Sequence, residues 1–176
     1  MTDSSTASIT VLAPGAYRLD PARSQVHYSG KHMFGMGAVR ATFTIEGGEL
    51  RIGEPLAASS IVVTVDAASF SSGNTKRDKD VCSAGLLDVA EHPVITFASD
   101  SVQQAGDALL VTGTVTAHGH TVEVDVHIDR ITDESTGIRL HGRAEHLDRT
   151  DFGITGSRGM VGRYLDLELD AFASTA

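Results

Sequence analysis

Apolar and polar residues alternate along most of this chain, and such alternation is typical of β-strands with one buried face. In residues 39–46, for example, Val39, Ala41, Phe43 and Ile45 share one face, and mostly polar residues share the other. Similar alternation occurs in residues 25–33, 59–68, 94–99, 138–146 and 164–172. The pattern therefore predicts an all-β fold.

The strongest hairpin signal spans residues 109–131, where two alternating arms flank the turn His118-Gly119-His120. A further turn is predicted at Gly47-Gly48. With the other alternating segments, these arms make about eight strands joined mostly by short turns. That count favours an antiparallel barrel or sandwich.

The longest break in the alternation covers residues 73–97, GNTKRDKDVCSAGLLDVAEHPVITF. Asn74 is a good helix N-cap, and Gly85 and Pro93 limit how far a helix can extend. We therefore expect a short helical segment around residues 74–92 that covers one end of the barrel.

The first 15 residues are rich in Ser and Thr and end in Ala13-Pro14-Gly15, which predicts a flexible tail. The following residues, 16–174, are expected to form a single domain. A chain of 176 residues with 41% hydrophobic residues is sufficient for one sizeable core.

Charge and composition limit the classes of molecule that this protein is expected to bind. Fourteen basic and 23 acidic residues give a net charge of −9, which repels nucleic acids and anionic membrane surfaces. No apolar run approaches the ~20 residues of a membrane span, and the first residues lack the basic start of a secretory signal. Cys82 has no second cysteine to pair with. We expect a cytoplasmic protein without nucleic-acid partners or stable membrane insertion.

Small residues recur on the faces that alternation places inside the barrel. They are Gly30, Ala41, Ala67, Gly113, Ala117, Gly142, Ala144 and Ala171. An eight-stranded barrel has room for large side chains or for one small ligand, so small inner residues favour a pocket. A flattened or plugged barrel explains them equally well. The same alternation places His146 on the inner face of its strand.

Several separated motifs resemble those of one family and occur in that family's order. They are DPARSQV at residues 20–26, KHM at 31–33, VRATF at 39–43, GNTKRD at 73–78, DVAEHPVITF at 88–97 and RTDFGI at 149–154. The chain thus resembles the YceI-like family of polyisoprenoid-binding proteins from about Tyr17 to Phe172. Each motif is weak alone, whereas the ordered set is specific.

The resemblance implies a lipocalin-like, extended antiparallel β-barrel with an elongated apolar pocket, often in a dimer. It implies that the protein binds, sequesters or transports an isoprenoid or similar long-chain lipid, such as a quinone tail, and catalyses no reaction. Two departures from the family pattern concern the helical segment. Asp80-Val81-Cys82 stands where the family usually has His-Leu, and Leu86-Leu87 stands where paired aromatics are usual.

Candidate site residues follow from this expectation. The predicted apolar lining is Phe43, Phe70, Leu86, Leu87, Ile95, Phe97 and Phe152, and the predicted contacts to a polar head group are Asn74, Lys76 and Arg77. The alternative for the apolar set is ordinary core packing. For the cations it is a solvated helix face with a nearby carboxylate partner.

Catalytic motifs are absent from the sequence, which has no Gly-x-Ser-x-Gly elbow and no phosphate-binding loop. Beyond a bound lipid, we expect no cofactor and no metal. His118 and His120 share a strand face, but the pair lacks the remainder of a cupin-type metal motif. Two alternatives stay open, namely a metal-dependent barrel enzyme using these histidines and a fully packed structural or interaction domain.

Overall fold

The computed structural model describes residues 13–32, 36–157 and 160–176, so most of the predicted tail lies outside the described residues. The described chain is mostly strand, with one α-helix, α1 (Thr75–Cys82). Its strands are β1 (Gly15–Leu19), β2 (Gln25–His32), β3 (Gly37–Ile52), β4 (Ser60–Asp66), β5 (Val94–Ala105), β6 (Ala108–Ala117), β7 (His120–Glu134), β8 (Gly137–Asp148) and β9 (Val161–Thr175). Short 3-10 turns are η1 (Pro21–Arg23), η2 (Leu56–Ala58), η3 (Ala67–Ser69) and η4 (Arg149–Phe152).

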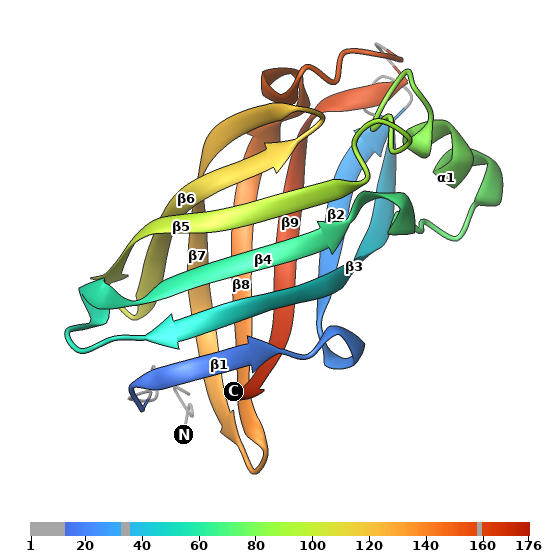
Figure 1. Ribbon diagram of the computed structural model, residues 1–176. Helices are drawn as coiled ribbons and strands as arrows, with labels where there is room; N and C mark the ends of the chain where they lie inside the picture. Colours follow the sequence, from blue (N-terminus) through green and yellow to red (C-terminus); the bar gives the residue numbers. More distant parts are fainter. Residues whose placement is uncertain (1–12, 33–35, 158–159) are drawn as a thin grey trace, which may run out of the picture.

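The strands form a closed antiparallel barrel (Figure 1). They follow the order β3-β2-β9-β8-β7-β6-β5-β4, and β4 pairs back onto β3 with Ile61 opposite Leu50. β1 and β2 share one position between β3 and β9: β2 pairs with the first part of each, and β1 pairs with their ends, where Leu19 lies opposite Ala173. This arrangement confirms the predicted barrel of about eight strands.

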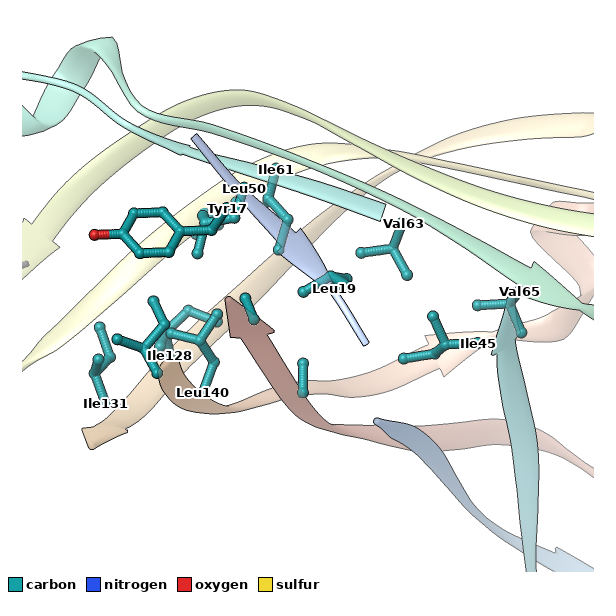
Figure 2. Packing of buried hydrophobic residues seen from close by; sticks show 14 of the residues in the cluster. Tyr17, Leu19, Ile45, Leu50, Ile61, Val63, Val65, Ile128, Ile131 and Leu140 are labelled. Atoms are coloured by element: carbon teal, nitrogen blue, oxygen red, sulfur yellow. The ribbon is translucent and has the colours of Figure 1, made fainter. Parts of the chain in front are cut away.

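Buried apolar side chains from opposite walls of the barrel form one core cluster. Figure 2 shows Leu50 and Ile61, from β3 and β4, facing Ile128 and Leu140 of β7 and β8. Leu19, which is 1% exposed, projects into this cluster from β1. The core therefore consists mainly of the inward positions of alternating strands, as the sequence pattern predicts.

Strand β1 and the path of β3 differ from the prediction. β1 was not anticipated, and Gly47-Gly48 is not a turn, because β3 continues through both glycines with a bulge against β4 between Ile45 and Gly47. A Cβ atom on Gly48 would lie against the Val62 carbonyl oxygen and 2.6 Å from Leu19 Cδ1. Gly48 therefore permits close approach of the neighbouring strands, and neither glycine reverses the chain.

His146 also departs from the prediction, since it is exposed and its ring stacks on Tyr164 with centroids 4.0 Å apart. A bulge between Ala144 and Leu147 shifts the register of β8 against β9. The extra residue ends the simple alternation, and a positive φ of 56° at His146 marks the bend.

The predicted helix N-cap and hairpin turn are both confirmed. The Asn74 side chain accepts a hydrogen bond from the Arg77 backbone N–H at 3.1 Å, and the chain turns at His118-Gly119 between β6 and β7. The helix is shorter than the expected segment, because turns occupy residues 83–92. In Figure 1, α1 lies at the end of the barrel opposite the C-terminus.

Leu19→Ala tests whether β1 belongs to the stable core. Truncating this 1% exposed side chain should lower the free energy of unfolding by about 2–5 kcal/mol, since the barrel closes only partly around the missing atoms. Val62→Ala, at a 47% exposed position, is the control and should change it by about 0.5 kcal/mol or less. Urea denaturation measures both, and equal small losses would place β1 outside the cooperative fold.

Candidate functional site: an apolar cavity and the loops at its α1 end

A narrow cavity of about 160 Å³ lies inside the barrel. It extends from Leu56 of η2 to Ile95, near the start of β5. Each strand from β2 to β9 contributes to its wall, for example through Val26, Phe43, Val63, Phe97, Val111, Ile128, Leu140 and Leu167. The sequence left a pocket and a plugged barrel open, and this cavity favours the pocket.

The small inner residues make less empty space than their number suggests. A Cβ atom on Gly113 would lie 2.7 Å from the ring of Phe97, and one on Gly142 would lie 2.8 Å from Ile128 Cδ1. Neighbouring side chains therefore occupy part of the volume that these glycines free. The cavity is consequently thin, although it touches eight strands.

Incomplete burial of inward-facing residues has the same origin. Phe97, Val126 and Leu167 point into the barrel and line the cavity, yet each is only partly buried. The empty space leaves part of their apolar surface without packing partners. An apolar group inside the cavity would contact this surface.

Three of the predicted lining residues, Phe43, Ile95 and Phe97, line the cavity. Phe70 lies behind Phe43, with ring centroids 5.3 Å apart in an edge-to-face contact, and it also contacts Tyr28 at 5.5 Å.

The other predicted apolar residues lie outside the cavity wall. Leu86 and Phe152 are buried elsewhere, and Leu87 packs against the edge of the core cluster. The predicted set thus includes residues near α1 that do not line the cavity. The missed positions, such as Leu50 and Val111, carry a signal in the sequence, because they are inward positions of alternating strands.

The predicted head-group residues do not line the cavity either. The side chain of Asn74 is engaged as the helix cap, Lys76 is exposed and Arg77 is half-buried. Among the described residues, no carboxylate forms an ion pair with Lys76 or Arg77. Their contact with a lipid head group stays a prediction.

Helix α1 is attached to the barrel by contacts on both sides. Ser72 donates to Asp78 Oδ1 from its backbone N–H at 2.9 Å and from its hydroxyl at 2.6 Å. On the inner side, Val81 and Cys82 pack against the core cluster. Burial, followed by the negative charges of Asp78 and Asp66, raises the pKa of the Cys82 thiol. Cys82 is therefore protonated at neutral pH and is a poor nucleophile.

The motif RTDFGI at residues 149–154 forms η4 and the loop that follows it at the same end. Buried Arg149 holds this loop by donating to the carbonyl oxygens of Ile154 at 2.9 Å and Gly162 at 3.0 Å. Burial raises the pKa of Tyr28, and the charge of Arg149 opposes the shift only in part. The Tyr28 hydroxyl is therefore neutral at physiological pH.

Comparison with known proteins identifies the family. The family model described as the YceI-like domain matches residues 17–173. The chain belongs to the YceI-like family. A UPF0312 protein of Vibrio cholerae is 30% identical over 154 residues, covering 84% of this chain and 80% of that protein. The YceI protein of Escherichia coli O6:H1 is 35% identical over 115 residues, covering 63% of this chain and 60% of that protein.

Two solved structures of YceI-like shape support the fold. BcnA of Burkholderia cenocepacia superposes with a TM-score of 0.79 at 22% identity, covering 89% of this chain and 99% of that one. A polyisoprenoid-binding domain from Saccharophagus degradans superposes with a TM-score of 0.62 at 14% identity, covering 93% and 100%. At these identities, the similarity establishes the lipocalin-like barrel alone.

Within the described residues, no helix has the length and hydropathy that crossing a membrane requires.

Asp148→Asn tests the cap that orders η4. Hydrogen bonding from the Thr150 hydroxyl, supported by Arg163, lowers the pKa of Asp148. The carboxylate therefore contributes stability above its unfolded pKa, and this contribution is lost as the pH falls through the folded pKa. Thermal melts should show the variant less stable than wild type at pH 7, and the difference should shrink as the pH falls through the lowered folded-state pKa of Asp148. A difference that is independent of pH would show that the charge of Asp148 has no part in the cap.

Proposed function

We propose that this YceI-like protein binds a polyisoprenoid or a similar long-chain lipid inside its barrel and sequesters or transports it without chemical conversion. The observation that carries the proposal is the cavity from Leu56 to Ile95, whose wall is apolar along nearly its whole length. Apolar cavities of similar size stay dry and bind hydrocarbon guests. A lipid segment would therefore displace little or no ordered water.

The shape of the cavity favours a chain over a ring system. Its volume of about 160 Å³ is below the roughly 300 Å³ at the lower end of small-molecule sites. Leu56 lies just before β4 and Ile95 pairs with Val65 near the end of β4, so this small volume extends along the length of that strand and is long and thin. A flexible prenyl or acyl segment fits such a space, whereas a fused-ring lipid requires a wider one. A long chain also requires lining side chains such as Phe43 and Phe97 to rotate.

Burial alone supplies enough free energy for useful affinity. At about 0.8 kcal/mol per buried CH₂ group, one five-carbon isoprene unit contributes about 4 kcal/mol before the cost of association. Three units contribute about 12 kcal/mol, which leaves about 8 kcal/mol, or micromolar binding, when association costs about 4 kcal/mol. No polar anchor inside the barrel is necessary for this affinity.

The cavity wall offers little chemistry beyond burial. Among the described residues, its polar members are Ser59, Ser60, Thr96, Arg143 and Glu168. The Ser59 hydroxyl accepts a hydrogen bond from the Gly53 backbone N–H at 2.9 Å, and the side chain of Arg143 pairs with carboxylates on the outer face. This environment supports carriage of a lipid and favours no catalytic role.

Family membership adds support, because the Saccharophagus degradans structure with the same fold is a polyisoprenoid-binding domain. We extend lipid binding to this chain on that basis. A quinone tail as the ligand, a homodimer as the assembly and a cytoplasmic location stay predictions.

Extraction of the purified protein with organic solvent tests the proposal. Mass spectrometry of the extract should detect a prenyl or long-chain lipid, or the lipid-free protein should bind added geranylgeraniol saturably. A protein that carries no lipid and binds neither geranylgeraniol nor a long-chain fatty alcohol would overturn the proposal.

Ala144→Leu tests whether the ligand occupies the cavity. Ala144 lines the cavity and is 6% exposed, so three added carbon atoms would fill part of the space that a chain needs. We expect at least about a tenfold loss of affinity for geranylgeraniol and a change in stability of about 1 kcal/mol or less, because the new atoms enter an existing void. Fluorescence competition and thermal melts measure the two effects.

Ala98→Leu is the matched control, because Ala98 is an exposed residue of β5 and does not line the cavity. It should leave the affinity unchanged. If Ala144→Leu folds and binds geranylgeraniol as tightly as wild type, the ligand lies outside this cavity.

A further inference from the structure

Two loops at the α1 end bring together three metal-ligating side chains that the lipid proposal does not use. Asp88 and His92 lie in the segment between α1 and β5, and His118 lies in the β6–β7 turn. One ligand atom from each residue lies within 4.8 Å of the other two. All three side chains are partly buried, and none lines the cavity.

Backbone hydrogen bonds hold the first two residues on one turn. The His92 N–H donates to the Asp88 carbonyl oxygen at 2.9 Å, which brings residues i and i+4 to the same side. The Leu87 N–H donates to the Val81 carbonyl oxygen at 2.8 Å, and the Ala67 N–H donates to the Pro93 carbonyl oxygen at 3.0 Å. The turn is thus attached to both α1 and η3.

His118 is oriented by a contact that also determines which ring nitrogen is free. Its Nδ1 lies 3.1 Å from the Phe152 carbonyl oxygen, which can only accept, so Nδ1 carries the proton and donates. Nε2 then has a free lone pair. Metal-bound histidines commonly donate their second ring nitrogen to a carbonyl in this way. The His92 ring lies beside it, with centroids 5.0 Å apart.

We infer that Asp88, His92 and His118 form a binding site for one divalent transition-metal ion of the Zn²⁺ type. Imidazole ligands suit Zn²⁺ and its neighbours, whereas Mg²⁺ and Ca²⁺ prefer all-oxygen sites. Metal–ligand bonds of about 2.0–2.1 Å place tetrahedral ligand atoms about 3.3 Å apart, so the cluster closes by small side-chain rotations. Three protein ligands leave further positions for water. The ion would bridge the segment after α1 and the β6–β7 turn.

This ligand set differs from the histidine pair that the sequence suggests. His120 is exposed, its ring stacks on that of His118 at 5.9 Å, and its Nδ1 lies 2.8 Å from the His118 carbonyl oxygen. His120 is outside the three-residue cluster. Substitution of His118 should therefore weaken metal binding, whereas substitution of His120 should not.

Titration of the untagged full chain with Zn²⁺, followed by isothermal calorimetry, tests the site. Wild type should bind one Zn²⁺ per chain and melt at a higher temperature with Zn²⁺ present. His92→Gln and His118→Asn should each weaken binding at least about tenfold. Asn is chosen for His118 because φ is +52° there, a region that Asn tolerates.

His120→Asn and His146→Asn are the controls, since each removes an exposed histidine outside the cluster, and His146 has a similar φ of 56°. Both should bind Zn²⁺ like wild type. Wild type without saturable binding would overturn the site, and so would loss of binding in His120→Asn alone.

Anomalous scattering from crystals grown with Zn²⁺ tests the ligand set independently of the variants. A peak bonded to Asp88, His92 and His118 is expected, and a peak elsewhere or none overturns the assignment. Failure of this site leaves the lipid proposal intact, because its residues and the cavity lining do not overlap.

Discussion

Pairing of β4 with β3 closes the sheet, and the interior of the protein depends on that closure. Without it, the edges of β3 and β4 would expose unpaired backbone groups, and the inward faces of eight strands would not enclose a common space. β1 completes the wall where β2 no longer reaches, so Leu19 seals one part of the core (Figure 2). Closure thus creates both a stable core and an apolar cavity with few polar groups that would hold water.

The size of that space is determined by pairs of small and large neighbours. Gly113 accommodates the ring of Phe97, and Gly142 accommodates Ile128, so small residues create grooves that adjacent side chains partly fill. The result is a thin cavity, with less empty volume than the number of small inner residues suggests. A thin, flexible ligand matches this interior, and rotation of the lining aromatic rings is the means by which a longer chain would be admitted.

Most of the barrel could be predicted because alternation, helix capping and hairpin turns are local properties of the sequence. Features that depend on contacts between residues far apart in the sequence could not be predicted in this way. Gly47-Gly48 resembles a turn until the opposing strand is known, and His146 follows the inner alternation until a bulge displaces it. The lining was predicted only in part, since Phe70 and Leu86 are equally apolar but pack beside the cavity and not around it.

Helix α1 and the turn after it were expected to cover one end of the barrel, but they do not line its cavity. Helix α1 packs against the barrel outside the cavity wall. In the turn after α1, the ring of His92 lies beside that of His118 in the β6–β7 turn, with centroids 5.0 Å apart. The proposed lipid binding therefore depends on the barrel interior and not on α1. A crystal structure of the protein with geranylgeraniol tests this most directly. Continuous electron density for the ligand is expected between Phe43, Phe97 and Leu140. Density confined to the outer surface, with the interior unchanged at saturating ligand, would contradict it.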